Sequence, residues 1–347
     1  MVKKDSHMSS TLTTPLNDPA AWYSRDLMEN DDWIHNLTKT EIKELTDAVT
    51  ASQRKSLLSI GRSDFPLPTL AVRLNTIAKE VDQGRGLALI RGIPVEKMSA
   101  DEAARALWGL GQHIGIPQIQ DAAQALLHDV RDVGGTWQDE SSRRVYETNA
   151  AQPFHNDGGD LVMLLCRRAA QSGGTSRMVS AVTLFNEVLR RSPSLADVLQ
   201  SPFPFDARGQ QLPGQPPVQH VPIFVWYADR LNALHKRHYI EEAQRFENVK
   251  RLSERQVQAL DLVDEICEDP AIHIAFDMIP GDIQVACNFN ILHARDRFVD
   301  HFETNKKRHM LRLWLGLPDG RPLAEVYRGT REFGPLFEVR GRGHLYD

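Results

Sequence analysis

The stretch Pro153-Phe154-His155-Asn156-Asp157-Gly158-Gly159-Asp160 decides how the chain is interpreted, because it places an imidazole and a carboxylate two residues apart. On an extended strand, residues i and i+2 point to the same face. We therefore expect His155 and Asp157 to be able to bind one metal ion from one side, while Asn156 points away. Alone, a His-x-Asp pair is a weak signal, since a hydrogen-bonded pair at a strand end has the same sequence.

A third metal ligand must come from elsewhere, and the sequence offers His293 in Asn288-Phe289-Asn290-Ile291-Leu292-His293-Ala294-Arg295. Two histidines and one carboxylate on one face of an ion are typical of non-haem Fe(II) sites, which keep positions open for a co-substrate and dioxygen. By contrast, His235 and His238 lie in a segment rich in Lys and Arg. That segment predicts a solvated, charged helix face and not a metal site.

Composition limits the classes of partner. The 347 residues carry 41 Lys and Arg against 46 Asp and Glu, a net charge of −5, so no basic field predicts binding to nucleic acid or to an anionic membrane surface. The chain contains no apolar run long enough to span a bilayer. Three cysteines without Cys-x-x-Cys spacing predict buried, reduced thiols and a cytoplasmic location; they are Cys166, Cys267 and Cys287.

The N-terminal third is predicted to lie around a core built by later residues. Residues 1–8 are interpreted as a vector-derived leader, and residues 9–347 as a single catalytic domain that begins with an arm and a helical buttress over 9–115. Apolar spacing and capping residues predict helices, and a short apolar run between two glycines predicts a buried strand. The predicted helices span 38–60, 66–84 and 99–115, and the strand spans 86–92.

From about residue 116 to 325 the pattern changes to short β-like runs separated by Gly and Pro, with helical insertions. Strands are predicted at 144–148, 161–166, 176–181, 221–226, 272–279, 283–287 and 308–317, and helices at 183–191, 231–246 and 253–268. This pattern predicts a mainly β protein with flanking helices, arranged as a distorted sandwich or barrel. Residues 326–347 are predicted to form either a tail or a lid over the pocket mouth.

The strand Arg308-His309-Met310-Leu311-Arg312-Leu313-Trp314-Leu315 has two distinct faces at a period of two. One face is mostly aliphatic and suits packing under helices. The other carries Arg308, Met310, Arg312 and Trp314. Two guanidinium groups on the inner side of a sandwich must find anions, because an unpaired buried charge is costly. If this face is outside, both arginines are merely solvated, but the Trp and Met beside them favour a pocket for a small carboxylate.

Taken together, these motifs resemble one enzyme family. His155-x-Asp157, then His293, then Arg308 fifteen residues later, follow the order found in the Fe(II)/2-oxoglutarate dioxygenases of the taurine and dichlorophenoxyacetate dioxygenase family, which includes clavaminate-synthase-like enzymes. Flanking motifs in the same order are Tyr146-x-Thr148-Asn149, Gly173-Gly174-Thr175-Ser176 and Pro280-Gly281-Asp282-Ile283. The resemblance covers roughly residues 86–325. It implies a double-stranded β-helix, the jelly-roll core of cupin-like proteins, for residues 116–325.

The resemblance also implies a role for individual residues. His155, Asp157 and His293 match the iron ligands. Arg308 and Ser176 match residues that bind the distal carboxylate of 2-oxoglutarate, and Arg312 matches an arginine that in several relatives holds an anionic group of the prime substrate. Asn149 and Asp160 lie close enough to the metal motif in sequence to be expected on the substrate side.

The implied activity is that of an Fe(II)- and 2-oxoglutarate-dependent oxygenase that uses O2 and releases succinate and CO2. Its substrate would be a small carboxylate-bearing molecule such as an amino acid, changed by hydroxylation, desaturation or oxidative cyclisation. Asp157 argues against halogenation, because related halogenases have a small residue there. Two alternatives stay open, a catalytically silent small-ligand-binding protein and a Zn- or Mn-dependent hydrolase. The sequence leaves the oligomeric state open, a homo-oligomer included.

Overall fold

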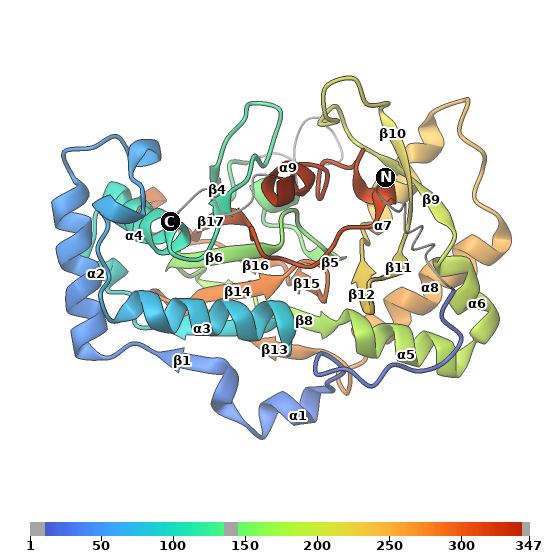
Figure 1. The fold of residues 1–347 in the computed structure, drawn as a ribbon, viewed down its shortest axis with the longest axis horizontal. Helices are drawn as coiled ribbons and strands as arrows, with labels where there is room; N and C mark the ends of the chain where they lie inside the picture. Colours follow the sequence, from blue (N-terminus) through green and yellow to red (C-terminus); the bar gives the residue numbers. More distant parts are fainter. Residues whose placement is uncertain (1–10, 135–144, 342–347) are drawn as a thin grey trace, which may run out of the picture.

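Two β-sheets pack face to face at the centre of the computed structural model, which describes residues 11–134 and 145–341 (Figure 1). The predicted leader at 1–8 lies outside these residues. The larger sheet has the order β1-β2-β14-β6-β17-β3, with β4 also paired to β17; its strands are β1 (Ile34–Asn36), β2 (Leu87–Arg91), β3 (Ile116–Pro117), β4 (Leu127–Val130), β6 (Leu161–Arg168), β14 (Ile283–Cys287) and β17 (His309–Gly316). The smaller sheet has the order β13-β8-β15-β5, formed by β5 (Gln152–His155), β8 (Ser176–Ser180), β13 (Ile274–Phe276) and β15 (Ile291–Arg295).

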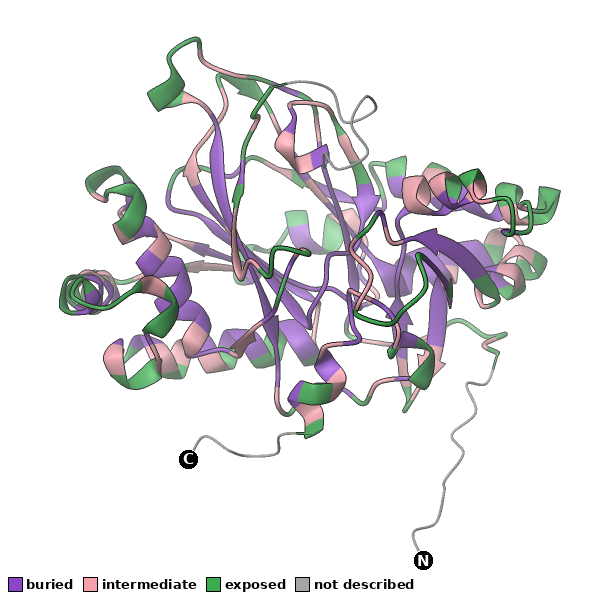
Figure 2. Ribbon diagram, turned by 90° about the horizontal axis from the view of Figure 1, so that it is seen from above, coloured by how far each residue is buried: buried purple, intermediate pink, exposed green. Residues whose placement is uncertain are grey.

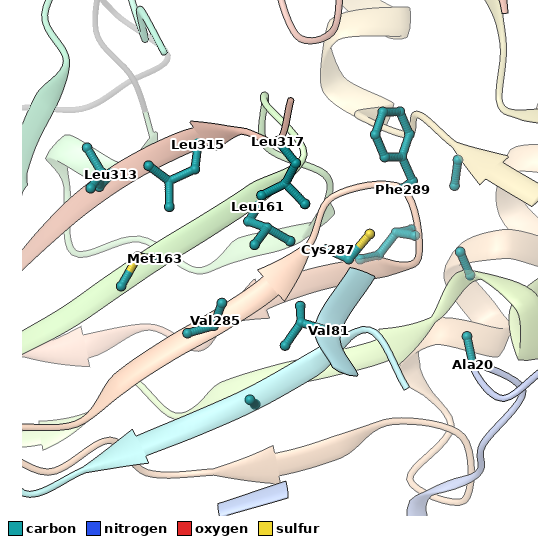
Figure 3. Packing of buried hydrophobic residues seen from close by; sticks show 14 of the residues in the cluster. Ala20, Val81, Leu161, Met163, Val285, Cys287, Phe289, Leu313, Leu315 and Leu317 are labelled. Atoms are coloured by element: carbon teal, nitrogen blue, oxygen red, sulfur yellow. The ribbon is translucent and has the colours of Figure 1, made fainter. Parts of the chain in front are cut away.

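Side chains alternate across the larger sheet as a period of two requires. One set packs in the main core with the helices: Leu161 and Met163 of β6, Val285 of β14, and Leu313 and Leu315 of β17 (Figure 3). The intervening residues face the smaller sheet. Val162, Ala286 and Trp314 pack there with Met178 and Ile291 of β8 and β15. The predicted division of the 308–317 strand into an aliphatic face and an arginine-bearing inner face is therefore confirmed.

Helices cover the outer face of the larger sheet and one end of the sandwich (Figures 1 and 2). The first group is α2 (Lys39–Ser52), α3 (Leu70–Gln83) and α4 (Ala100–Gln112), of which α3 contacts β2 and β14 while α4 contacts β6 and β17. The second group is α5 (Ala181–Arg191), α6 (Pro193–Leu199) and α8 (Glu254–Glu268), which pack on one another. Capping boxes begin α2, α4 and α8.

The remaining elements are short. Hairpins join β9 (Pro202–Asp206) to β10 (Val218–Pro222) and β11 (Phe224–Tyr227) to β12 (Arg230–Ala233), and β7 (Ser172–Gly173) pairs with β16 (Phe298–Val299). The other helices are α1 (Ser24–Met28), α7 (Arg237–Glu242) and α9 (Leu336–Gly341). Single 3₁₀ turns lie at Asp31–Trp33, Leu57–Ser59, Arg62–Asp64, Val95–Lys97, Val145–Glu147, Ala243–Arg245, Thr304–Lys306 and Glu325–Tyr327. The predicted mainly β sandwich with flanking helices is confirmed.

Two predicted elements have the wrong type, and the single strand predicted at 221–226 is instead divided between β10 and β11 at Ile223. The expected helix over 231–246 is instead strand β12 followed by the short α7, because Ala228 and Asp229 both adopt positive φ and turn the chain back in a tight hairpin. The described part of the expected strand at 144–148 is a 3₁₀ turn. There the Thr148 hydroxyl donates to the Val145 carbonyl oxygen at 2.9 Å, a local bond that competes with strand pairing.

Two predictions from composition concern the whole chain. All three cysteines are free and buried, as expected. Within 11–134 and 145–341, the helices are all too short or too polar to cross a bilayer.

Candidate active site

Antiparallel pairing places two histidines directly opposite each other. His155 at the end of β5 and His293 in the middle of β15 are register partners, and their ring centroids lie 4.4 Å apart. β5 ends at His155, so Asp157 follows in the loop. Its carboxylate oxygens lie 4.0 Å from His155 Nε2 and 3.7 Å from His293 Nε2. One ligand atom from each residue lies within 4.8 Å of the others, and all three side chains are buried.

Asn156 fixes the backbone between His155 and Asp157. Its amide nitrogen donates to the carbonyl oxygens of Asn288 and Ile291, at 2.8 and 2.9 Å, and its side-chain oxygen accepts from the His235 backbone N–H at 2.7 Å. The prediction that Asn156 points away from the metal ligands is confirmed. The predicted solvated face at 235–238 is wrong for His235, whose side chain is fully buried.

The protonation of the triad suits a divalent metal ion. Burial lowers the pKa of both His155 and His293, so the rings stay neutral and can act as ligands. The His155 Nδ1–H donates to the Pro153 carbonyl oxygen at 2.8 Å, which leaves the Nε2 lone pair directed away from the backbone. Burial alone would raise the pKa of Asp157, but the Arg312 guanidinium keeps it below its ordinary value. The donor set therefore fits Fe(II).

Two cavities meet at this triad. The first, called here the sheet cavity, lies between the sheets and is lined by Ser176, Gln284, Arg295, Arg308 and Met310. The second, called the loop cavity, is lined mainly by residues between strands, including Gln120, Arg208, Lys236, Tyr239 and Arg331, together with Trp314. Tyr146, Gln152, His155, Asp157 and Arg312 line both. A molecule in either cavity would therefore contact the triad.

The sheet cavity holds two guanidinium groups that have no ion-pair partner in the described part of the chain. The Arg295 and Arg308 guanidiniums lie 4.7 and 5.1 Å from the centroid of the same Phe298 ring. Neither forms an ion pair with a residue that the structure describes, and Nη1 of Arg295 is buried without a hydrogen-bond partner there. Burial, and then the neighbouring Arg308, lowers the pKa of Arg295 to about 9. An anionic ligand would relieve this repulsion.

The loop cavity holds cations that are paired. Lys236 Nζ and Arg331 Nη2 both donate to Oε1 of Glu332, at 2.6 and 3.1 Å. Burial alone would raise the pKa of Glu332, but Lys236 and Arg331 lower it to about 2. Arg312 donates to Asp157 at 3.1 Å and to Oε1 of Gln120 at 2.8 Å.

The predicted site residues divide into two groups. His155, Asp157 and Arg312 line both cavities, whereas His293, Ser176 and Arg308 line the sheet cavity. Asp160 does not: its carboxylate is fully buried and accepts from Arg340 Nη1 at 3.0 Å and from the Leu317 backbone N–H at 2.7 Å. The substrate-side prediction for Asp160 is therefore corrected to a structural one. Asn149 is half-buried and its carbonyl oxygen accepts from the Phe298 N–H, so its expected role stays a prediction.

Several residues of the site were assigned no role from the sequence. Arg295 could have been found, because it lies two residues after His293 and so shares its inward face on β15. Lys236, Arg331 and Glu332 come from segments that gave no usable local signal. Gln152 was also missed; its amide nitrogen lies 2.9 Å from His155 Nε2.

The sequence pattern of the taurine catabolism dioxygenase TauD, TfdA family matches residues 42–314. The chain belongs to this family. Membership confirms the predicted enzyme class, an Fe(II)/2-oxoglutarate-dependent dioxygenase, and the predicted cofactors Fe(II), 2-oxoglutarate and O2.

Individual relatives in the family are distant but cover most of the chain. FR-33289 synthase of Streptomyces rubellomurinus is 26% identical over 90% of this chain and 94% of its own length. The taurine hydroxylase-like protein SAT17 of Stachybotrys chartarum is 26% identical over 89% of this chain and 82% of its own.

Solved structures confirm the fold of this dioxygenase. Asparagine oxygenase in complex with Fe(II), 2S,3S-3-hydroxyasparagine and succinate superposes with a TM-score of 0.61 at 18% identity, over 82% of this chain and 94% of that one. The non-haem iron oxygenase OrfP in complex with Fe and alpha-ketoglutaric acid gives a TM-score of 0.57 at 12% identity, over 82% and 94%. The predicted cupin-like, jelly-roll core is therefore confirmed.

Proposed function

We propose that this dioxygenase activates a C–H bond of a small, carboxylate-bearing molecule such as an amino acid or its derivative. His155, Asp157 and His293 hold Fe(II), the sheet cavity takes 2-oxoglutarate, and the loop cavity takes the prime substrate. The observation that carries the proposal is the position of the triad where the two cavities meet, because co-substrate and substrate must both reach one metal ion.

Arg295 and Arg308, which form no ion pair with any described residue, support the position of 2-oxoglutarate. Its distal carboxylate can accept charge-assisted hydrogen bonds from Arg308, and the Ser176 hydroxyl lines the same cavity. Arg295 adds a second positive charge beside Arg308. The cavity is thus prepared for an anion before one arrives, which reduces the reorganisation required on binding.

Bound Fe(II), with 2-oxoglutarate and O2, supplies the oxidising chemistry that ends in release of succinate and CO2. The residues of this chain position the reactants. Asn156 fixes the loop between two ligands, and Pro153 orients the His155 ring through its carbonyl oxygen. Arg312, which lies between the rings of Tyr146 and Trp314 at 4.6 and 5.0 Å from their centroids, is held to bind an anionic group of the substrate.

The amino-acid-like substrate is supported by the ligands of the structural neighbours. One neighbour contains 3-hydroxyasparagine, and OrfP has been solved with (3S)-hydroxy-L-Arg. We further infer a cytoplasmic location from the net charge and the free, buried cysteines, while a homo-oligomer stays a prediction.

Succinate release tests the proposal. The protein, supplied with Fe(II), 2-oxoglutarate and O2, is expected to release succinate faster when the correct amino acid or derivative is added. Asp157→Ala should lose this activity by more than about 100-fold, because it removes a metal ligand. Substrate turnover without 2-oxoglutarate would favour the Zn- or Mn-dependent hydrolase instead.

A further inference from the structure

The C-terminal segment adds a second arginine to the substrate side of the site. The Arg331 guanidinium lies 5.4 Å from the centroid of the Trp314 ring, and the Arg312 guanidinium lies 5.0 Å from the same centroid. Both arginines line the loop cavity beside His155 and Asp157. Two cations of the cavity, one from β17 and one from the segment after Tyr327, are therefore gathered on a single indole.

The charges around this pair leave an excess of positive charge. Arg331 shares its carboxylate partner, Glu332, with Lys236, so one buried and one partly buried cation face one anion. The Arg312 guanidinium forms an ion pair with the Asp157 carboxylate, and a bound metal ion would share that negative charge. The other charged side chains lining the cavity have partners of their own: Arg208 lies 3.2 Å from Glu242, and Asp121 lies 3.0 Å from His128.

The Trp314 side chain also carries a donor that has no partner among the described residues. The Trp314 indole N–H is buried, and it has no acceptor among residues 11–134 and 145–341. A buried donor without an acceptor is costly, and a ligand oxygen would satisfy it. This observation is independent of the excess of positive charge.

Packing fixes Arg331 in this position. The Phe333 ring, two residues later, stacks on Phe289 with centroids 4.2 Å apart, and the Glu332 carbonyl oxygen accepts from the Gly159 N–H at 2.8 Å. Arg340 binds the buried Asp160 carboxylate. Residues 328–341 thus lie against the core, so of the two predictions for 326–347 the free tail does not describe them.

We propose that Arg331 and Arg312 together bind one compact oxyanion of the prime substrate, so that the C-terminal segment helps to select the substrate. A carboxylate, sulfonate or phosphonate offers the oxygen acceptors that two guanidiniums require. This inference rests on the proposed function, since the triad and Arg312 define the side of the cavity where the substrate lies.

The test measures binding of three small probes, acetate, methanesulfonate and methylphosphonate, by calorimetry under anaerobic conditions. The protein carries Fe(II) and saturating 2-oxoglutarate, and each probe represents one oxyanion class. Wild type is expected to bind at least one probe. Arg331→Gln should lower the affinity for that probe by about tenfold or more, because a charge-assisted hydrogen bond is lost. Arg331→Lys should recover part of the affinity.

Arg328→Gln is the matched control, because Arg328 lies on the same segment, is exposed and pairs with Glu325 outside the cavity. It should bind the probe as wild type does, and 2-oxoglutarate affinity should be unchanged in every variant. The inference is overturned if no probe binds wild type, if Arg331→Gln binds it equally well, or if 2-oxoglutarate displaces it. If the Fe(II) protein fails to bind 2-oxoglutarate, the proposed function is defeated instead. The probe titrations can be repeated without 2-oxoglutarate, so the two failures can be distinguished.

Discussion

The sheet cavity and the loop cavity share one triad but balance their charges differently. In the sheet cavity, Arg295 and Arg308 lie on Phe298 without an anion from any described residue. In the loop cavity, Lys236 and Arg331 are held by Glu332. This difference implies that the positive charges of the sheet cavity are balanced only when a ligand binds, whereas those of the loop cavity are balanced by internal ion pairs. The first should gain stability when 2-oxoglutarate binds; the second should depend on its own carboxylate.

The largest expected effect comes from removing the carboxylate that pairs with the cations of the loop cavity. Glu332→Gln leaves the buried Lys236 and the partly buried Arg331 with one neutral partner, so the free energy of unfolding should fall by about 3–5 kcal/mol at pH 7, measured by urea unfolding. Glu325→Gln, which removes an exposed carboxylate from the same segment, should change it by less than about 0.5 kcal/mol.

The pH dependence gives the sign of this effect. The pKa of Glu332 is lowered from 4.5 to about 2 in the folded protein, so its contribution is complete above pH 4.5 and is lost as the pH falls towards 2. The difference between wild type and Glu332→Gln should therefore shrink across that window. A difference that stays constant, or grows, would mean that the ion pairs do not hold this cavity together.

A slightly smaller effect is expected on the ligand of the sheet cavity. Arg308→Gln should weaken 2-oxoglutarate binding to the Fe(II) protein by about 2–5 kcal/mol, because the distal carboxylate loses its main charge partner in a buried site. Calorimetry without oxygen measures this directly. Arg297→Gln removes an exposed arginine nearby and should bind 2-oxoglutarate normally. Equal affinities in the two variants would place 2-oxoglutarate elsewhere.

The smallest expected effect favours the ligand-free protein but disfavours 2-oxoglutarate binding. Arg295→Met removes a buried cation that has no ion-pair partner among the described residues, and should stabilise the ligand-free protein by about 1 kcal/mol at pH 7. The same change should weaken 2-oxoglutarate binding by about tenfold.

The stabilisation should also depend on pH. The pKa of Arg295 is lowered to about 9, so its cost to folding is complete below pH 9 and fades as the pH rises above that value. The advantage of Arg295→Met should therefore shrink above pH 9 in thermal unfolding. If Arg295→Met instead destabilises the ligand-free protein at pH 7, the positive charge of Arg295 is already balanced by other groups of the protein.

The same contrast explains how much the sequence could predict. The sheet cavity follows from local periodicity, because alternation along 308–317 places Arg308 and Arg312 on one inner face. The opposition of His155 and His293 depends on the register between β5 and β15, and only the folded sheet defines that register.

The loop cavity was beyond reach for a different reason. Lys236 lies in a charged segment and was interpreted as solvated, yet its partner Glu332 is 96 residues away. Arg331 and Glu332 lie in the segment predicted to be a tail or a lid. Their burial arises from long-range packing such as the Phe289–Phe333 stack, which no local pattern encodes.

The most direct test of the account is a visible absorption spectrum of the metal-free protein, titrated without oxygen with Fe(II) and then 2-oxoglutarate. Wild type, and the exposed control His220→Ala, should develop a weak charge-transfer band only when both are present, and His155→Ala should not. Bound metal without a band would contradict the account in favour of a metal-dependent hydrolase. No metal binding at all would favour a catalytically silent binding protein.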